Sequence, residues 1–302
     1  MNKLGDWYSY HIFCYDTLQH EEVVLRIHSL MEKLMEDKKV LKWFFIRYWR
    51  GGPHIRVRYC SNEDINFQVH LKGIIQYIKR KSKIKLTKSQ YYASQNIVEE
   101  DTAREDLPWY KDGECVNIAY EPEFERYGGI NAMPFSESLF HLSTDLSVKI
   151  LKLTHGQNWV TKTIFSIAVI ISLIEQLIKK RVIRYEQTDL FNIGMEKWKE
   201  TFRINESEEI LQIKQAIKSC TKAFLTLKEK LKNEIEFSAL LDSHIELFKN
   251  IALCVEEQAY FMSIVFSHIH MFNNRLGIFP TLEYCIFDVL SKQTGGEGLG
   301  FK

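Results

Sequence analysis

Apolar and polar positions divide the chain into two parts with different periodicity. Before residue 134, four short runs are rich in aromatic and β-branched residues, which favour strands. These runs are residues 7–16, 41–49, 54–60 and 115–120. Between them, residues 21–36 and 65–78 carry apolar side chains at the three-to-four-residue spacing of amphipathic helices. This part of the chain therefore predicts a mixed sheet with helices.

After Pro134 the apolar positions follow helical spacing almost throughout. The helical stretches are residues 135–153, 161–180, 206–232 and 235–273, and Pro280 fits the start of a last helix over 281–291. The predicted fold class is α+β, an N-terminal mixed sheet with helices followed by a predominantly helical C-terminal half. We expect a single domain over residues 1–294, with halves at about 1–133 and 134–294, and a flexible tail over 295–302.

Two stretches stand apart from this pattern. Residues 79–113 have no clear period, and a long excursion of this kind in a domain is functional or mobile. The most apolar run, residues 164–178, contains Ser166, Ser172 and Glu175 and is shorter than the roughly 20 residues that span a bilayer. We therefore predict a buried helix there. The first residues lack the apolar core of a signal peptide, so we expect a cytoplasmic protein without a membrane span.

Composition and charge narrow the kinds of partner. The chain has 302 residues, 45% of them hydrophobic, with 40 Lys and Arg against 39 Asp and Glu, for a formal net charge of +1. This composition is typical of a folded globular protein, and the charge gives no broad field to attract nucleic acid. An anion site must therefore be built from a few placed residues. The six cysteines form no CxxC pair, so we expect reduced packing residues and no zinc motif.

The densest chemical signal is residues 43–59, WFFIRYWRGGPHIRVRY. The Gly-Gly-Pro sequence at 51–53 would reverse the chain between two strands. In the second strand the two-residue period places His54, Arg56 and Arg58 on one face. Two guanidinium groups on one strand face can hold a carboxylate or phosphate through paired N–H donors. The alternative is an exposed strand face that carries surface charge.

Arg47 lies in the first of these strands, where it follows Trp43 and Phe45 on an otherwise apolar face. A buried arginine needs an anionic partner. Arg47 is therefore a second kind of candidate, an arginine whose position on an apolar face argues against plain surface charge.

A constrained loop carries another arginine. In YEPEFERYGG, residues 120–129, Pro122 favours extended geometry before it and the two glycines permit a turn with positive φ. Arg126 is displayed there beside three glutamates. An acidic turn neutralised by its own arginine explains the residue types equally well.

The third candidate segment is SHIHMFNNRLG, residues 267–277. On a helix, His268 and His270 lie about 200° apart and cannot chelate one ion, which argues against a metal site. His270 and Asn274 share a face, and a histidine so placed suits general acid–base catalysis at neutral pH. A core histidine with its hydrogen bonds satisfied is the alternative. The chain contains no P-loop, GxGxxG, GxSxG or HExxH motif.

Five segments, taken in order, carry a family resemblance: FFIRY, PHIRVRY, YEPEFERYGG, PFSESLFHLSTDLS and HMFNNRLG. Together they resemble the glutamate-elimination domain of class I lanthipeptide dehydratases, which also occurs as a stand-alone protein in thiopeptide-type bacteriocin biosynthesis. The resemblance covers most of the chain. In that family a glutamylation protein first esterifies Ser or Thr of a precursor peptide with glutamate from glutamyl-tRNA. The elimination domain then removes the α-proton and expels glutamate, leaving dehydroalanine or dehydrobutyrine.

The resemblance implies a set of site residues and partners. The family's arginines match Arg56, Arg58 and Arg126, and its histidine matches His270, which gives the expected catalytic set. We add a set of expected substrate-binding residues: Arg47, His54, Asn274 and Arg275. No cofactor or metal is expected. The expected partners are a precursor peptide with its leader and a separate tRNA-dependent glutamylation protein, without direct nucleic-acid binding, and a homodimer is possible.

Two departures from the family pattern keep alternatives open. The span between Arg58 and Arg126 is longer than the family usually shows, and the large glutamylation region is absent, which implies a split system. Stand-alone relatives of the same fold close a six-membered nitrogen ring from two dehydroalanines, a formal [4+2] aza-cycloaddition that ejects the leader. Such cyclases tend to lose the arginine set, so its retention here favours elimination. A non-catalytic scaffold that carries the precursor peptide is the third hypothesis.

Overall fold

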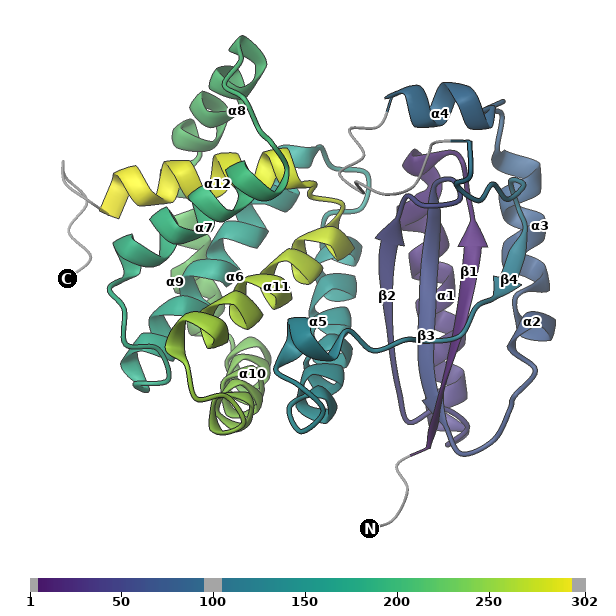
Figure 1. The fold of residues 1–302 in the computed structure, drawn as a ribbon, viewed down its shortest axis with the longest axis horizontal. Coiled ribbons are helices and arrows are strands. Elements are labelled where there is room, and N and C mark those ends of the chain that lie inside the picture. Colours follow the sequence, from purple (N-terminus) through teal and green to yellow (C-terminus); the bar gives the residue numbers. More distant parts are fainter. Residues whose placement is uncertain (1–4, 95–104, 295–302) are drawn as a thin grey trace. The chain divides into compact units, whose positions relative to one another are not determined.

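The computed structural model describes residues 5–94 and 105–294, drawn as the coloured ribbon in Figure 1. The chain divides into two compact units, Met1–Pro122 and Glu123–Lys302, which we call the sheet unit and the helical unit and describe separately. The expected flexible tail over 295–302 lies outside the described residues, as does the middle of the irregular stretch 79–113. One domain over 1–294 stays a prediction.

The sheet unit contains four strands in the order β2-β3-β1-β4. They are β1 (Asp6–Phe13), β2 (Lys42–Tyr48), β3 (His54–Ser61) and β4 (Cys115–Asn117). All four predicted strands are confirmed, but the pairings among the described strands are antiparallel, so the predicted mixed sheet is corrected. The reason is that β3 turns back after β2 and inserts between β2 and β1. Two strands that a helix connects are therefore not neighbours, and the four described strands form no parallel pair with one another.

Helices cover one face of this sheet. They are α1 (His20–Glu36), α2 (Phe67–His70) and α3 (Lys72–Lys81), with the short 3₁₀ turn η1 (Thr17–Gln19) before α1. α1 packs against β3, and its His28 ring meets the Trp43 ring edge-on. From α2, Phe67 packs against Tyr10 and Tyr59. The face that carries Trp43 and Tyr59 is therefore the one these helices cover.

A further helix, α4 (Lys88–Ser94), lies in the stretch without periodicity. Aromatic side chains, and not an amphipathic stripe, anchor this helix. Tyr91 and Tyr92 pack with Leu107, Trp49 and Trp109. The Tyr92 hydroxyl also accepts a hydrogen bond from the Gly51 N–H at 2.8 Å. The irregular stretch is thus fastened to the β2–β3 turn, which no periodicity in the sequence could indicate.

The helical unit begins with the 3₁₀ turn η2 (Phe124–Tyr127), and the helices that follow share its core. They are α5 (Met133–Leu153), α6 (Trp159–Lys179), α7 (Gln187–Thr201), α8 (Glu208–Ser219), α9 (Thr221–Lys232), α10 (Ile235–Leu253), α11 (Gln258–Leu276) and α12 (Pro280–Thr294). The α+β class with a helical C-terminal half is therefore confirmed. The start of the last helix at Pro280 is confirmed as well.

Two predicted helices are each two helices in the structure, and one helix was not predicted. The stretch 206–232 breaks at Cys220 and the stretch 235–273 breaks over residues 254–257, while α7 lies where we had predicted no element. Neither break contains Gly or Pro, the residues that usually mark helix ends, so the apolar spacing runs on through both. The correction is one of connectivity and leaves the helical class unchanged.

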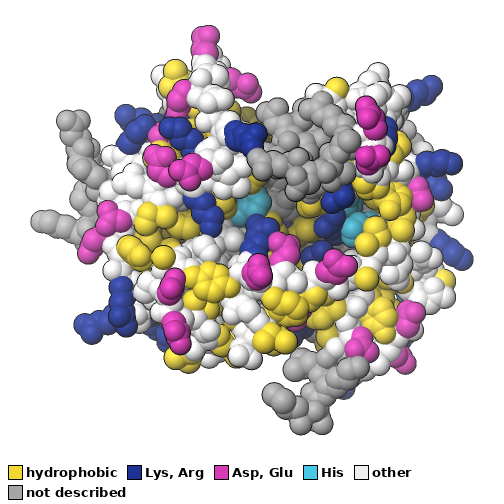
Figure 2. Space-filling view, in the orientation of Figure 1, with side chains coloured by type: hydrophobic (Ala, Val, Ile, Leu, Met, Phe, Trp, Pro, Cys, Tyr) yellow, Lys and Arg dark blue, Asp and Glu magenta, His cyan; other side chains and the backbone are white. Residues whose placement is uncertain are grey.

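The apolar run at 164–178 lies in α6. By length and composition alone α6 could cross a membrane, with a mean hydropathy of 1.6 over its best window, but 61% of that window is buried within the structure. It packs against α8, α9, α10 and α11. The predicted buried helix is confirmed. On the face drawn in Figure 2, acidic and basic side chains are interspersed over both units, in keeping with the near-neutral charge.

Candidate functional site

The second face of the sheet carries the predicted cationic strand. Residues paired across neighbouring strands share a face, and the register pairs Arg56 with His11 of β1 and Arg58 with Ser9. His54 pairs with Phe13 on the same face. The structure therefore brings His54, Arg56 and Arg58 together, as the two-residue period predicts, on the face opposite the one covered by α1 and α2.

Aromatic rings hold the two guanidinium groups on this face. The Arg56 guanidinium carbon lies 3.4 Å from the centre of the Tyr48 ring, and that of Arg58 lies 4.7 Å from the Tyr120 ring and 5.6 Å from the Phe44 ring. Stacking of this kind uses the flat face of a guanidinium and fixes its plane, and the N–H donors lie in that plane. The two guanidinium groups thus lie against aromatic rings on one face, and a guanidinium group can bind a carboxylate through paired N–H donors.

Two histidines beside these arginines are neutral. Burial, followed by the positive charge of Arg56, lowers the pKa of His11 to about 2, and burial lowers the pKa of His54 to about 3. The His54 Nδ1–H donates to the Gly52 carbonyl at 2.8 Å, and its Nε2 accepts from the Arg56 Nε–H at 3.2 Å. Both hydrogen bonds fit the same neutral tautomer, in which Nδ1 carries the hydrogen. The positive charge on this face therefore belongs to Arg56 and Arg58.

Arg47 lies on the other face of the sheet. It pairs with Ile55 of β3, whereas Arg56 pairs with Ile46, so the two arginines point to opposite sides. Burial lowers the pKa of Arg47 to about 10, and the carboxylate of Glu21 on α1 opposes that shift. Glu21 is thus an anionic neighbour of the kind that the sequence analysis predicts for a buried arginine. The structure does not bring Arg47 together with Arg56 and Arg58, and its substrate-binding role stays a prediction.

In the helical unit, a short turn positions Arg126. Its Nη1 donates to Glu123 Oε2 at 3.1 Å, and its Nε donates to the Ser267 hydroxyl on α11 at 3.4 Å. The turn ends at Gly128, whose φ of 94° favours glycine and where an added Cβ would lie 2.7 Å from the Cβ of Ala132. The glycine pair of the motif therefore serves to set Arg126 against α11.

His270 lies one turn along α11 from Ser267 and shares its face. Its Nδ1 lies 2.7 Å from Oε1 of Glu283, a side chain on α12 with 0% of its surface exposed. The rings of Trp198 and Phe202 lie 5.3 and 5.9 Å from the imidazole ring. His270 itself is half-buried. The histidine is therefore fixed on one side by a buried carboxyl group and on another by aromatic rings.

A second cation approaches Arg126 from α7. Burial, followed by the charge of Arg126, lowers the pKa of Lys197, which precedes the ring that packs on His270. Within the helical unit the structure thus gathers Arg126, Lys197, the Ser267 hydroxyl and His270 around one face of α11. Two cations and a hydroxyl suit an anionic group, and the histidine can exchange a proton.

The other two predicted residues of α11, Asn274 and Arg275, lie in different surroundings. Asn274 is half-buried and shares the face of His270. Arg275 is entirely buried, and its Nη1 donates to the Ser143 hydroxyl of α5 at 3.2 Å. The structure therefore groups Asn274 with His270 and does not group Arg275 with it. Substrate binding by either residue stays a prediction.

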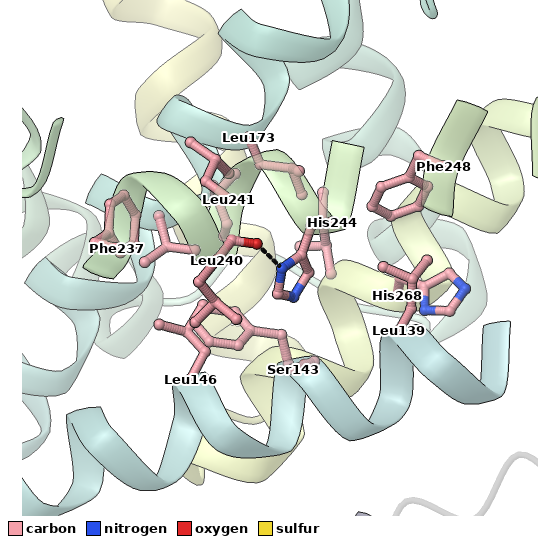
Figure 3. A pocket seen from close by; sticks show the side chains of 14 residues that line it. Leu139, Ser143, Leu146, Leu173, Phe237, Leu240, Leu241, His244, Phe248 and His268 are labelled. Carbon is pink, nitrogen blue, oxygen red and sulfur yellow. Dashed lines mark hydrogen bonds between the residues drawn. The ribbon is translucent and has the colours of Figure 1, made fainter. Parts of the chain in front are cut away.

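A small cavity within the helical unit offers no substrate site (Figure 3). It has a volume of about 40 Å³ and is lined mainly by apolar residues of α5, α6, α10 and α11, with His244 and His268 among them. The His244 Nδ1–H donates to the Leu240 carbonyl at 2.8 Å, and burial lowers the pKa of both histidines. A space of a few water molecules lined by neutral groups is a packing void. In the described residues, no cluster of three or more His, Cys, Asp or Glu could hold a metal ion.

Comparison with known families shows which family the chain belongs to. A family model described as "Lantibiotic biosynthesis dehydratase C-term" matches residues 7–294, almost the whole described chain. The chain belongs to this family. The resemblance drawn from the motifs is thereby confirmed, and Arg56, Arg58, Arg126 and His270 all lie within the matched range of this lantibiotic dehydratase C-terminal domain.

Individual relatives of this dehydratase domain are distant. The subtilin biosynthesis protein SpaB of Bacillus subtilis is 21% identical over 174 residues, which is 57% of this chain and 14% of SpaB. The tRNA-dependent lantibiotic dehydratase MibB from Microbispora sp. 107891 has a TM-score of 0.54 and 18% identity, covering 97% of this chain and 28% of MibB. The chain thus spans less than a third of either relative, and the likeness to MibB shows the fold.

Two solved structures match this chain along almost their whole length. The pyridine synthase TbtD from thiomuracin biosynthesis has a TM-score of 0.67 at 12% identity, covering 95% of this chain and 96% of TbtD. TsrL has a TM-score of 0.56 at 13% identity, covering 96% of this chain and 95% of TsrL. At these identities the likeness again establishes the fold and leaves the reaction open.

Three residues that lie beside the candidate residues of their own unit were missed in the sequence analysis. His11 becomes a neighbour of Arg56 only through the pairing of β1 with β3, and Lys197 lies on the unpredicted helix α7. Glu283 did leave a signal, since it is an acid in the first turn of a helix that continues YCIFDVL. A buried carboxyl group in such a helix calls for a partner, and that partner is His270.

Proposed function

We propose that this protein eliminates glutamate from glutamylated Ser or Thr residues of a ribosomally made precursor peptide, giving dehydroalanine or dehydrobutyrine. The observation that carries the proposal is that a chain of the dehydratase family has arginines and a histidine, matched to the family's set by the motif resemblance, in contexts that fit the chemistry. Arg56 and Arg58 share one strand face and lie against aromatic rings, and Arg126 contacts Ser267 on the face of α11 that carries His270.

The reaction breaks two bonds and forms one double bond. The Cα–H proton passes to a base, its electron pair forms the Cα=Cβ bond, and the Cβ–O ester bond breaks so that glutamate departs as a carboxylate. Arginines remain protonated at neutral pH, so Arg56 and Arg58 are suited to binding carboxylates of the glutamyl group. Negative charge develops on the peptide carbonyl and on the leaving carboxylate, and Arg126 with Lys197 can stabilise it. His270 is the group of this set that exchanges a proton.

This chemistry also defines the partners. Elimination requires a peptide that is already glutamylated, so a tRNA-dependent glutamylation activity must act first, and we assign it to a separate protein. The peptide and its leader are then the direct partners of this chain. The near-neutral charge of the chain agrees with a protein that handles peptide and leaves tRNA to its partner. A homodimer stays a prediction.

A second candidate function has one specific observation in its favour. The pyridine synthase TbtD covers 95% of this chain, with the highest TM-score of the three structures compared. Its proposed counterpart here would be a [4+2] aza-cycloaddition of two dehydroalanines with loss of the leader. That reaction has no glutamate to bind, whereas this chain retains arginines suited to carboxylates. We therefore rank elimination first.

One experiment separates these functions. The protein is incubated without ATP or added metal, once with a glutamylated precursor peptide and once with a multiply dehydrated peptide that carries its leader. Elimination predicts free glutamate and the matching mass loss from the first peptide. Cyclisation of the second peptide with leader release, and an unchanged first peptide, would establish the cyclase. Binding of either peptide without conversion would support a scaffold.

A further inference from the structure

Glu283 stands out among the acidic residues of the helical unit. It lies in the first turn of α12 with 0% of its surface exposed, and its Oε1 is 2.7 Å from Nδ1 of His270. Its second oxygen, Oε2, is also buried and has no hydrogen-bond partner among the described residues. Burial of a carboxylate is unfavourable unless a partner compensates for it. The partner that the structure supplies is the imidazole of His270.

A purely structural role for Glu283 explains part of this arrangement. A carboxylate in the first turn of a helix is stabilised by the helix dipole, but that effect does not depend on burial and requires no contact with an imidazole ring. Asp288 on the same helix offers a direct comparison. It is 4% exposed, and both of its oxygens bind Lys292 Nζ, at 2.8 and 2.9 Å, with Lys214 Nζ at 3.3 Å. Asp288 is paired with permanent cations, whereas Glu283 is paired with a group that gains and loses protons.

The contact sets the hydrogen positions on the imidazole. A carboxylate accepts hydrogen bonds, so Nδ1 must carry the hydrogen, and the neutral ring then has its lone pair on Nε2. Trp198 and Phe202 pack against the ring and limit its rotation. When Nε2 takes up a proton, the adjacent carboxylate stabilises the imidazolium that results. Geometry on both sides of the ring therefore leaves Nε2 as the atom that exchanges a proton.

We propose that Glu283 is a positioning residue, which holds His270 in the Nδ1–H tautomer and directs Nε2 to the substrate. The proposal rests on the proposed elimination function, in which His270 exchanges a proton with the peptide. Glu283 touches no substrate and acts through His270 alone. It follows that its loss lowers the rate of conversion and leaves binding of the glutamylated peptide unchanged.

The tautomer is tested first, by nitrogen NMR of the protein labelled with ¹⁵N-histidine, with His270 assigned from the signal missing in His270→Gln. We expect Nδ1–H in the wild-type protein. Glu283→Gln retains an amide oxygen as acceptor and keeps this tautomer, whereas Glu283→Leu removes the acceptor and shifts the ring to Nε2–H, the form that free neutral histidine prefers. Nε2–H in the wild-type protein, or no change in Glu283→Leu, would overturn the proposal.

The kinetic test uses the rate of glutamate release from the glutamylated peptide. Glu283→Leu should lower kcat about 10²-fold or more, because the contribution of a positioned acid or base is typically 10²- to 10⁴-fold. Glu283→Gln should lower kcat about 10-fold, since it loses the charge and keeps the tautomer. KM should change less than 2-fold in both, and the matched variant Asp288→Asn should retain kcat. Loss confined to KM, or an equal loss of kcat in Asp288→Asn, contradicts a positioning role.

The two tests distinguish failure of the proposed function from failure of the positioning role. If the wild-type protein releases no glutamate, the proposed function is wrong, while the NMR measurement still decides whether Glu283 sets the tautomer. If Glu283→Leu does not fold, the smaller Glu283→Ala also removes the acceptor and still gives the kinetic answer, because an unchanged kcat in that variant sinks the proposal.

Discussion

Two histidines, His11 in the sheet unit and His270 in the helical unit, have neighbours of opposite charge. In the sheet unit, His11 has Arg56, His54 and Arg58 around it, and burial with these charges lowers its pKa to about 2. In the helical unit, His270 faces the buried carboxyl group of Glu283. A histidine among cations stays neutral and serves as a stacked ring, whereas one on a carboxylate can hold a proton and return it. Under the proposed function, this comparison predicts anion binding in the sheet unit and proton exchange in the helical unit.

The largest effect should come from removing the group that exchanges protons. His270→Gln is expected to lower kcat for glutamate release by about 10²- to 10⁴-fold with little change in KM. Arg56→Gln should instead raise KM, because it removes a donor to the carboxylate and leaves the acid–base group in place. Initial rates over a range of glutamylated peptide concentrations give both constants. Equal losses of kcat in the two variants would contradict the proposed division of roles between the two units.

Acid stability offers the next largest contrast. The pKa values of His11, His54 and His20 are lowered to about 2, 3 and 4, each chiefly by burial, from 6.5 in the unfolded chain. The unfolded state therefore binds more protons below pH 6.5, and stability present above that pH is lost as the pH falls towards the folded values. Each histidine should remove about 1.4 kcal/mol per pH unit, or roughly 2 kcal/mol between pH 6.5 and 5.

Urea unfolding at pH 7, 6 and 5 measures this slope. His11→Asn cannot take up the proton and should flatten the dependence by the share of one histidine. The control is His70→Asn, at an exposed position of the same unit. A slope equal to that of the wild-type protein in His11→Asn would show that His11 is not held neutral by the fold.

The sequence predicts those parts of the fold that depend on local spacing. Alternation along β3 was enough to place Arg56 and Arg58 on one face, and helical spacing was enough to group His270 with Asn274. Both predictions use only the geometry of a single element. The α+β class followed from the same kind of evidence.

Features that depend on pairing between elements could not be predicted. The insertion of β3 between β1 and β2 decides that Arg47 faces α1 and that His11 faces Arg56, and nothing in any single strand encodes that order. The Glu283 contact likewise depends on how α12 packs after Gly277 ends α11 with a φ of 81°. The breaks after α8 and α10 lacked Gly or Pro and left no signal.

A smaller effect is expected from two glycine substitutions that test how rigid the turn that carries Arg126 is. Gly128 and Gly129 both have positive φ, at 94° and 86°, so an alanine at either position is strained by about 1–2 kcal/mol. An added Cβ at Gly128 would also lie 2.7 Å from Ala132 and 3.2 Å from Ile264, whereas Gly129 has nothing within 4 Å. Gly128→Ala should therefore be less stable than Gly129→Ala by about 1–3 kcal/mol, because overpacking adds to strain.

Urea midpoints of the two variants give this difference, and glutamate release gives its consequence. Gly128→Ala should also lower the rate of release, since relief of the clash moves the turn and with it the Arg126–Ser267 contact. Equal stability of the two alanine variants would mean that the turn shifts freely and does not fix Arg126.

The smallest expected effect has the opposite sign and lies in the sheet unit. Gly73 is exposed in the first turn of α3, has no positive φ, and an added Cβ there would meet nothing within 4 Å. Gly73→Ala should raise the free energy of unfolding by about 0.5 kcal/mol, because alanine loses less backbone entropy in a helix than glycine does. The measurement is the urea midpoint, with glutamate release expected to stay at the wild-type rate. α3 belongs to the helices that cover one face of the sheet, and Arg56 and Arg58 lie on the other face. A change in the rate of glutamate release would therefore show that these helices also influence the face that carries the two arginines.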